Sequence, residues 1–249
     1  MISLEVCANS LTSALAAQEG GAIRVELCEN LNEGGTTPSY GQILMARKLL
    51  KIKLYPLIRP REGDFLYSDI EFEVMKADIY HCIEAKCNGI VIGILNPNGS
   101  IDKRRCGELV SMAKQKGLGV TFHRAFDMCS DMNQGLEDII EIGCERVLTS
   151  GGKSTAIEGA NVINHLIERA ASRITIMPGS GINETNVADL VHFTGATEVH
   201  SSARGVIKSK MQYQNDHIIM GSNYIDEFSL AMTDVQKVKN IIKNANGKG

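Results

Sequence analysis

Two short apolar segments near the start of the chain carry the same pair of polar residues. Glu5 and Cys7 alternate with aliphatic residues in the first segment, and Glu26 and Cys28 do so in the second. Because successive side chains of a β-strand point to opposite faces, each segment would place its carboxylate and its thiol on one face. The repeat predicts two consecutive parallel strands that deliver these groups to a shared site, although packing and salt bridges would also explain the residues. Carboxylates at such a site could act as general acids or bases.

Three further charged or titratable residues follow other apolar segments. His123 comes at the end of one segment, where an imidazole could exchange protons with a substrate, although a lone buried histidine is more often satisfied by local hydrogen bonds. Arg59 and Arg61 lie at and just after the end of another segment and could hold an anionic substrate. The same two arginines could instead pair with Asp64 or Asp69 and fix the loop.

A glycine-rich turn precedes the seventh helical segment. Gly179, Ser180 and Gly181 would let backbone N–H groups approach an anion, and the N-terminus of the following helix would attract negative charge. The hydroxyl groups of Ser201 and Ser202, at the end of the next apolar segment, could add hydrogen bonds. Barrel enzymes often bind phosphate at this position, so the two motifs predict an anion-binding site, although a tight turn alone would also use glycine.

The elements that must position these residues alternate along the chain. Short apolar runs bounded by turn residues predict eight strands, at 2–7, 22–28, 53–59, 89–95, 118–123, 145–150, 173–178 and 197–202. Segments with helical periodicity predict eight helices, at 10–20, 39–51, 69–87, 102–116, 133–142, 156–171, 184–194 and 233–245. Ser68 and Glu71 fit a capping box at the start of the third helix.

This strict alternation predicts the fold class. Parallel neighbouring strands need a crossover connection, which is usually a helix. Eight such units in 249 residues fit an α/β fold of the (β/α)8 TIM-barrel type better than an open doubly wound sheet. No linker divides the chain, so we expect a single domain over residues 1–249. Residues 203–232 are expected to form a long loop before the last helix, of the kind that serves as a lid, a binding segment or an interface.

Composition limits the setting in which the chain works. The net charge of −3 gives no electrostatic reason to expect a nucleic-acid or membrane partner. The first residues lack the basic start and apolar core of a signal peptide, and no apolar run is long enough to cross a membrane. The 7 cysteines are odd in number and scattered, which favours free thiols in a reducing cytoplasm.

The motifs together resemble the CutC family of copper-homeostasis proteins. The matching segments span nearly the whole chain in order, at 4–7, 24–28, 33–39, 59–69, 121–128, 146–151, 177–182 and 198–203. The resemblance implies a cytosolic (β/α)8 barrel that forms a homodimer or larger homo-oligomer, takes part in copper handling and binds Cu(I). Carried over residue by residue, it implies that Cys7 and Cys28 are the copper-binding thiols. Thiolates are soft ligands that suit Cu(I).

Three functions remain open at this level. The first is Cu(I) binding for copper homeostasis, as the resemblance implies. The second is catalysis by an isomerase or lyase on a small phosphorylated or carboxylated metabolite, because paired arginines, carboxylates and a phosphate-type turn exceed what a metal carrier needs. Glu5, Glu26 and His123 would then be the acids or bases, and Arg59 and Arg61 would hold the anionic group. The third is non-catalytic binding of such a metabolite, because a fold alone does not decide function.

Overall fold

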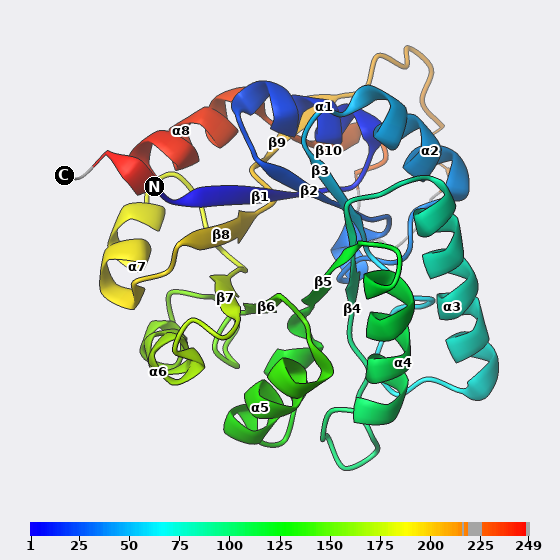
Figure 1. Ribbon diagram of the computed structural model, residues 1–249. Coiled ribbons are helices and arrows are strands. Elements are labelled where there is room, and N and C mark those ends of the chain that lie inside the picture. The colour runs from blue at the N-terminus through cyan, green and yellow to red at the C-terminus, as the bar shows by residue number, and fades with distance from the viewer. Residues whose placement is uncertain (216, 219–225, 248–249) are drawn as a thin grey trace.

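Eight strands alternate with eight α-helices in the computed structural model, which describes residues 1–215, 217–218 and 226–247 (Figure 1). The strands are β1 (Ser3–Ala8), β2 (Arg24–Leu27), β3 (Lys53–Pro56), β4 (Gly89–Ile92), β5 (Gly119–Phe122), β6 (Arg146–Thr149), β7 (Thr175–Pro178) and β8 (Glu198–Ser201). The helices are α1 (Leu11–Gly20), α2 (Tyr40–Leu49), α3 (Asp69–Glu84), α4 (Lys103–Lys114), α5 (Met132–Ile142), α6 (Ala160–Ala170), α7 (Val187–Thr194) and α8 (Val235–Asn246). Every predicted strand and helix is present, with shifted ends.

The strands follow one another in chain order around a barrel, and the helices lie outside them (Figure 1). One parallel sheet has the order β3-β2-β1-β8, and the other has the order β4-β5-β6-β7. They join just past β3, where the Ile58 N–H donates to the Val91 carbonyl at 2.8 Å. On the other side β7 lies beside β8, without a hydrogen-bonded ladder between them in the described part of the chain. The predicted α/β fold of the (β/α)8 type is confirmed.

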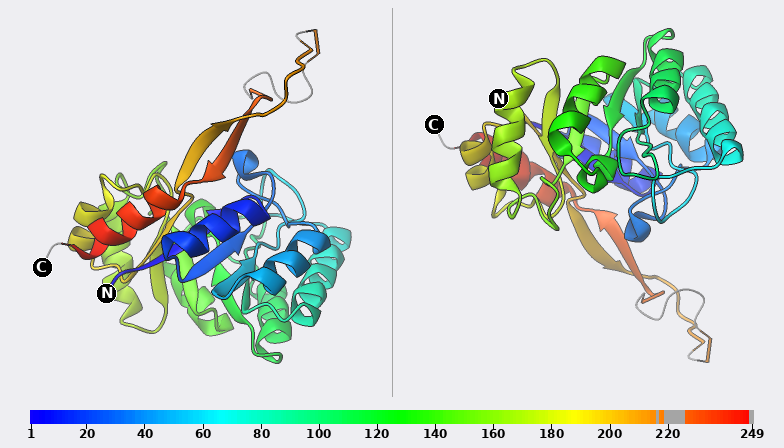
Figure 2. Two further views of the ribbon diagram at one scale, coloured as in Figure 1. Left: turned by 90° about the horizontal axis from the view of Figure 1, so that it is seen from above. Right: turned by 90° about the horizontal axis from the view of Figure 1, so that it is seen from below.

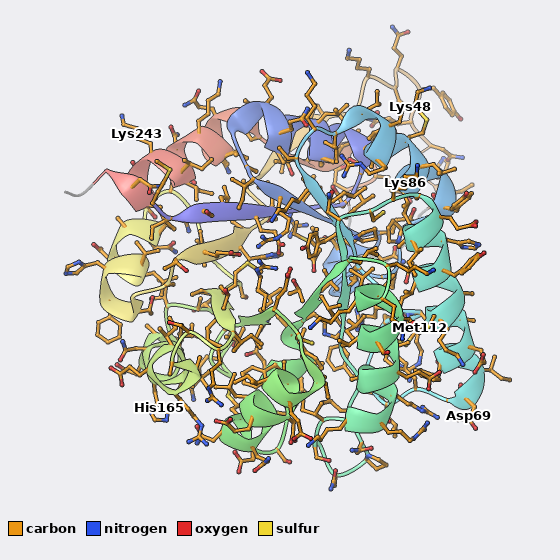
Figure 3. The ribbon with its side chains drawn as sticks, viewed as in Figure 1. Lys48, Asp69, Lys86, Met112, His165 and Lys243 are labelled. Carbon is orange, nitrogen blue, oxygen red and sulfur yellow. The ribbon has the colours of Figure 1, made fainter. Side chains whose placement is uncertain are left out.

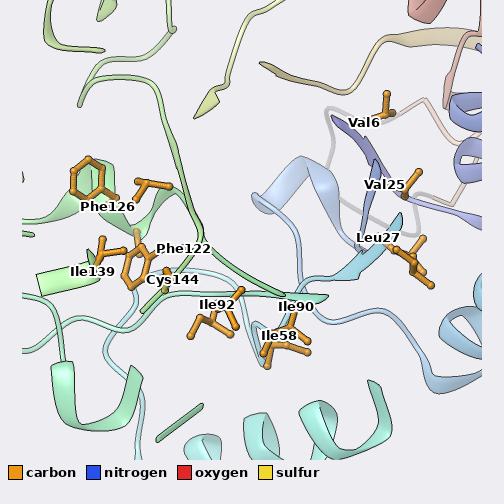
Figure 4. Packing of buried hydrophobic residues seen from close by; sticks show 14 of the residues in the cluster. Val6, Val25, Leu27, Ile58, Ile90, Ile92, Phe122, Phe126, Ile139 and Cys144 are labelled. Carbon is orange, nitrogen blue, oxygen red and sulfur yellow. The ribbon is translucent and has the colours of Figure 1, made fainter. Parts of the chain in front are cut away.

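The two faces of the strands carry different side chains. Aliphatic and aromatic residues of the outer face pack in the buried layer beneath the helices, as Figure 4 shows for Val6, Val25, Ile90, Ile92 and Phe122. The alternate positions, which include Glu5 and Cys7, face the interior of the barrel. Strand register places Glu5 level with Arg24 of β2 and with His200 of β8. The alternation seen in the sequence thus brings polar groups of neighbouring strands together inside the barrel.

The helices cover the barrel with apolar faces and expose charged residues to solvent. Val238 and Ile241 of α8 are buried, whereas Lys243 lies on the outer side of the same helix (Figure 3). The capping box at the start of α3 is confirmed, because the Glu71 N–H donates to Ser68 Oγ at 3.3 Å and the Ser68 N–H donates to Glu71 Oε2 at 2.7 Å. None of the helices in the described ranges is long and apolar enough to cross a membrane.

The connection between β8 and α8 differs from the expected long loop. Within 203–232 the structure has an antiparallel hairpin of β9 (Arg204–Lys208) and β10 (Ser229–Thr233), which projects away from the barrel (Figure 2). Much of the hairpin is exposed to solvent, so its sequence lacks the apolar alternation that marks a half-buried strand. Residues 216 and 219–225 of this connection lie outside the described residues.

Candidate functional site

A cavity of about 500 Å³ opens at the carboxyl ends of the barrel strands, where sites are built in this fold. The sequence-predicted site residues that line it are Cys7, Glu26, Cys28, Arg59, His123, Ser180, Gly181, Ser201 and Ser202. Glu5, Arg61 and Gly179 are not among its lining residues. The structure therefore gathers most of the predicted site from β1, β2, β5, β8 and the loops after β3 and β7.

Cys7 and Cys28 form a pair of free thiols at the cavity wall. Their Sγ atoms lie 3.6 Å apart, too far for a disulfide bond, and both side chains are buried. The pair forms because β1 and β2 are adjacent parallel strands, with Cys7 level with Glu26, two residues before Cys28. The hydrogen bond to Cys28, burial and the Glu26 carboxylate raise the pKa of Cys7 well above its ordinary value. The Cys7 thiol is therefore protonated near pH 7.

Glu26 and His200 extend the thiol pair into a cluster of candidate metal ligands. One ligand atom from each of Cys7, Glu26 and His200 lies within 4.8 Å of the others, and all three residues are buried. His200 Nε2 is 3.7 Å from Glu26 Oε2. Burial raises the pKa of Glu26 against the opposing effect of His200. Thiols, an imidazole and a carboxylate together form a donor set that suits a soft or borderline metal ion.

Glu5 lies beneath this cluster and connects it to an arginine. Its Oε1 is 2.7 Å from His200 Nδ1, and its Oε2 pairs with Arg24. Burial acts to raise the pKa of Glu5, but Arg24 and the His200 hydrogen bond outweigh burial and lower the pKa to about 2. Burial acts to lower the pKa of His200, but the Glu5 hydrogen bond and the Glu26 charge outweigh it and raise the pKa. Glu5 is thus an ionised partner of His200, set below the cavity.

Three charged residues below the cavity complete a buried network that the sequence alone did not single out. Arg24 Nη2 donates to Glu198 Oε2 at 2.5 Å, and Arg146 Nε donates to the same oxygen at 2.6 Å. Both guanidinium groups lie against the ring of Tyr55, at 5.4 and 5.9 Å from its centre. These ion pairs fill the lower barrel interior with polar groups where most (β/α)8 barrels carry branched aliphatic side chains.

His123 follows β5, which lies across the barrel from β1. Its Nδ1 accepts a hydrogen bond from the Ala125 N–H at 3.0 Å, whereas its Nε2 is buried and has no partner among the described residues. Burial and the charge of Arg59 lower the pKa of His123 to about 3, so the ring is neutral near pH 7. The ring of Phe65 lies 5.1 Å from the imidazole.

The structure separates the two arginines of the β3 loop. Arg59 is buried and lines the cavity, and its guanidinium donates to the backbone carbonyls of Glu33, Gly35 and Gly63. Arg61 points away from the cavity and donates to side chains of its own loop and of α3 at 2.9 and 2.6 Å. Arg59 can therefore contact a ligand in the cavity. Arg61 instead fixes the loop through Asp64, which is the alternative to anion binding that the sequence allowed.

The turn after β7 reaches the cavity through Ser180 and Gly181. Ser180 has a φ of +81°, in the left-handed region that favours glycine, and its Oγ donates to the Ser154 carbonyl at 2.7 Å. Ser201 Oγ donates to the Ile182 carbonyl at 2.7 Å. The N–H groups of Ser180, Gly181 and Ile182 have no acceptor among the described residues. All three residues line the cavity.

Comparison with known proteins shows the family. The CutC family model matches residues 2–205, which include all the cavity residues described above. The chain belongs to the CutC family. Proteins named CutC from Chromobacterium violaceum and Bacteroides fragilis are 47% and 49% identical to it, over 95% and 96% of both chains respectively. The resemblance to the CutC family that the sequence motifs indicated is confirmed.

A solved structure agrees with this assignment. CutC from Streptococcus agalactiae, which is named for copper homeostasis, is 36% identical with a TM-score of 0.77, and the match covers 81% of this chain and 99% of that one. Thiamine phosphate pyrophosphorylase from Pyrococcus furiosus matches with a TM-score of 0.61 and 12% identity, over 99% of this chain and 96% of that one. This second likeness shows the fold alone.

Proposed function

We propose that this CutC-family chain binds Cu(I) at the Cys7–Cys28 pair and serves copper homeostasis in the cytoplasm. The observation that carries the proposal is the 3.6 Å separation of two buried thiol sulfurs at the wall of an open cavity. Thiolates are soft ligands that select Cu(I) over the hard cations that oxygen ligands hold. The name of the Streptococcus agalactiae relative, which refers to copper homeostasis, supports a role in copper handling, and a reducing cytoplasm would keep the thiols free.

His200 is the most suitable further ligand for the ion. Its Nδ1 is hydrogen-bonded to Glu5, so its Nε2 is the nitrogen that could bind an ion in the cavity. A carboxylate that holds the far nitrogen of a histidine ligand fixes the ring orientation and raises its basicity, as in many metal sites. Glu5 would therefore act on the metal only through His200, whereas Glu26 could contact it directly.

Anaerobic titration against a competing Cu(I) chelator tests the proposal. The native protein should bind Cu(I) stoichiometrically, and the double variant Cys7→Ser with Cys28→Ser should lose this binding while its circular dichroism spectrum is unchanged. Cys129→Ser is the matched control, because Cys129 is a half-buried thiol that is not among the cavity-lining residues. Unchanged Cu(I) binding by the double variant, or its loss in Cys129→Ser, would show that the pair is not the site.

A second candidate function is the binding or conversion of a small anionic metabolite. The specific observation is that the cavity, at about 500 Å³, is far larger than an ion needs and is lined on its other sides by Arg59, Arg124 and the turn at Ser180 and Gly181. The site would hold the anion with Arg59 and the backbone N–H groups of the turn. An isomerase or lyase would turn over a compound from a metabolite pool, whereas a binding protein would only retain it.

We also propose that the chain forms a homo-oligomer through the β9–β10 hairpin. Val206, Ile207 and Leu230 of the hairpin are 73%, 51% and 50% exposed, on a two-stranded sheet that projects from the barrel (Figure 2). A two-stranded sheet is marginally stable alone in water, and exposed apolar groups on an open edge invite pairing with another strand. A second copy of the chain would supply that strand.

A further inference from the structure

Arg59 and His123 line the cavity, and each has a buried N–H donor without a well-formed hydrogen bond. These donors are Arg59 Nε and His123 Nε2. The Tyr67 hydroxyl beside Arg59 is likewise buried without a well-formed hydrogen bond within the described ranges. The two residues are 4% and 5% exposed, and both line the cavity. Burying a polar group without a partner is unfavourable, so an acceptor from a ligand would remove this cost.

The protonation of His123 follows from its other ring nitrogen. Because Nδ1 accepts from the Ala125 N–H, Nδ1 must carry the lone pair. Burial and the charge of Arg59 lower the pKa of His123 to about 3, so the ring carries a single proton near pH 7. That proton lies on Nε2, which is the nitrogen that lacks a partner. His123 is therefore a neutral hydrogen-bond donor toward the cavity rather than a base.

The charge of Arg59 has no carboxylate partner in the part of the chain that the structure describes. Its Nη atoms donate to three backbone carbonyls at 2.6, 2.8 and 2.9 Å, and these acceptors are neutral. Arg24, which is equally buried, is held by the carboxylates of both Glu5 and Glu198. Buried charges are normally paired, so Arg59 keeps a positive charge that an anionic ligand would balance.

Both donors are held in place by the surrounding residues. The ring of Phe65 lies 5.1 Å from the imidazole of His123 and 5.1 Å from the guanidinium carbon of Arg59, so it packs against both side chains. Gly93 makes room for His123, because a Cβ at this position would lie 2.4 Å from the imidazole Cε1. Phe65 and Gly93 thus fix the two side chains beside the cavity, which limits the rearrangement that a ligand requires.

We propose that Arg59 and His123 bind the carboxylate group of a small organic acid in this cavity. One carboxylate oxygen accepts from Arg59 Nε, and the other accepts from His123 Nε2. The proposal rests on the second candidate function, since it names the class of metabolite, and it does not depend on Cu(I) binding by the thiols. A carboxylate offers two acceptor atoms and one negative charge, which match two N–H donors and one cation. The three N–H groups of the turn after β7 would suit a second anionic group of the same ligand.

The test uses the native, copper-free protein, uniformly labelled with ¹⁵N, at pH 7. Sodium acetate, sodium phosphate and sodium chloride are added separately at equal ionic strength, and the Nε2 resonance of His123 is followed. Acetate should shift this resonance saturably and chloride should not, while the exposed His165 serves as an internal control. If acetate leaves His123 unchanged, the carboxylate site is wrong. If only phosphate binds, and does so at the Gly181 N–H, the metabolite function survives while the carboxylate assignment is overturned.

Two variants locate the acetate response. His123→Asn keeps an acceptor for the Ala125 N–H but removes Nε2, and it should weaken acetate binding about tenfold or more. His165→Asn makes the same change at an exposed histidine that is not among the cavity-lining residues, and it should bind acetate as the native protein does. Equal acetate affinity in His123→Asn and the native protein would overturn the proposal.

Discussion

Glu5 Oε1 lies 2.7 Å from His200 Nδ1, below the cavity and inside the barrel. The other ring nitrogen of His200 is 3.7 Å from Glu26 Oε2, so one imidazole lies between two carboxylates. The two carboxylates differ, because the pKa of Glu5 is lowered to about 2 whereas that of Glu26 is raised. Glu5 is therefore the ionised partner of His200, whereas burial favours the neutral form of Glu26.

Replacing Glu5 by glutamine should destabilise the fold strongly. The substitution keeps the shape of the side chain but leaves the buried Arg24 and His200 without their shared carboxylate. Removing one partner of a buried ion pair costs about 3–5 kcal/mol, so the free energy of unfolding measured in urea should fall by a similar amount. Glu137→Gln is the control, because Glu137 pairs with Arg173 at the surface, where salt bridges contribute little. Equal losses in the two variants would contradict the network.

The pKa values of the two buried histidines should lie on opposite sides of the pKa of free histidine. The pKa of His200 is raised above its ordinary value of 6.5, whereas that of His123 is lowered to about 3. Because the folded pKa of His200 exceeds the unfolded one, its contribution to stability is complete below about pH 6.5 and is lost as the pH rises through the folded pKa. NMR titration should show both shifts, and the stability advantage of the native protein over His200→Asn should shrink above that pH. A His123 resonance that titrates near 6.5 would disprove the assignment.

The alternation of side chains along β1 and β2 allowed one part of the site to be predicted from the sequence. Placing Glu5 with Cys7, and Glu26 with Cys28, on one strand face required only the alternation of side chains, and the structure brings Cys7 and Cys28 together. The same alternation could have singled out Arg24, which shares the face of Glu26. Which inward residues meet across the barrel depends on strand stagger, and a sequence does not specify that stagger.

Loop residues were harder to assign for a different reason. Arg59 and Arg61 look alike in the sequence, and only the path of the loop directs Arg59 to the cavity and Arg61 to Glu71 of α3. Nothing in the sequence showed that Glu5 would orient His200, because the two residues lie 195 positions apart in the chain. The β9–β10 hairpin escaped prediction because its residues are largely solvated and carry no core pattern.

Uptake of Cu(I) should release protons if the thiol pair is the site. The pKa of Cys7 is raised well above its ordinary value, so the thiol is protonated near pH 7 and must lose its proton to bind metal. Titration in weak buffer should release about one to two protons per Cu(I), and the affinity should rise with pH. The Cys7→Ser with Cys28→Ser variant should release none. Stoichiometric binding without proton release would place the ion elsewhere.

Charging the hairpin should dissociate the homo-oligomer without unfolding the barrel. Ile207 and Leu230 are paired across the β9–β10 sheet and are 51% and 50% exposed, so lysine there faces solvent in the monomer but enters an apolar interface in the oligomer. Light scattering after size exclusion should show a native oligomer and a monomeric Ile207→Lys with Leu230→Lys variant of unchanged melting temperature. Ile70→Lys is the control, because Ile70 is 79% exposed at the start of α3, away from the hairpin. A native protein that is monomeric at micromolar concentration, or a double variant that stays oligomeric, would remove the hairpin as the interface.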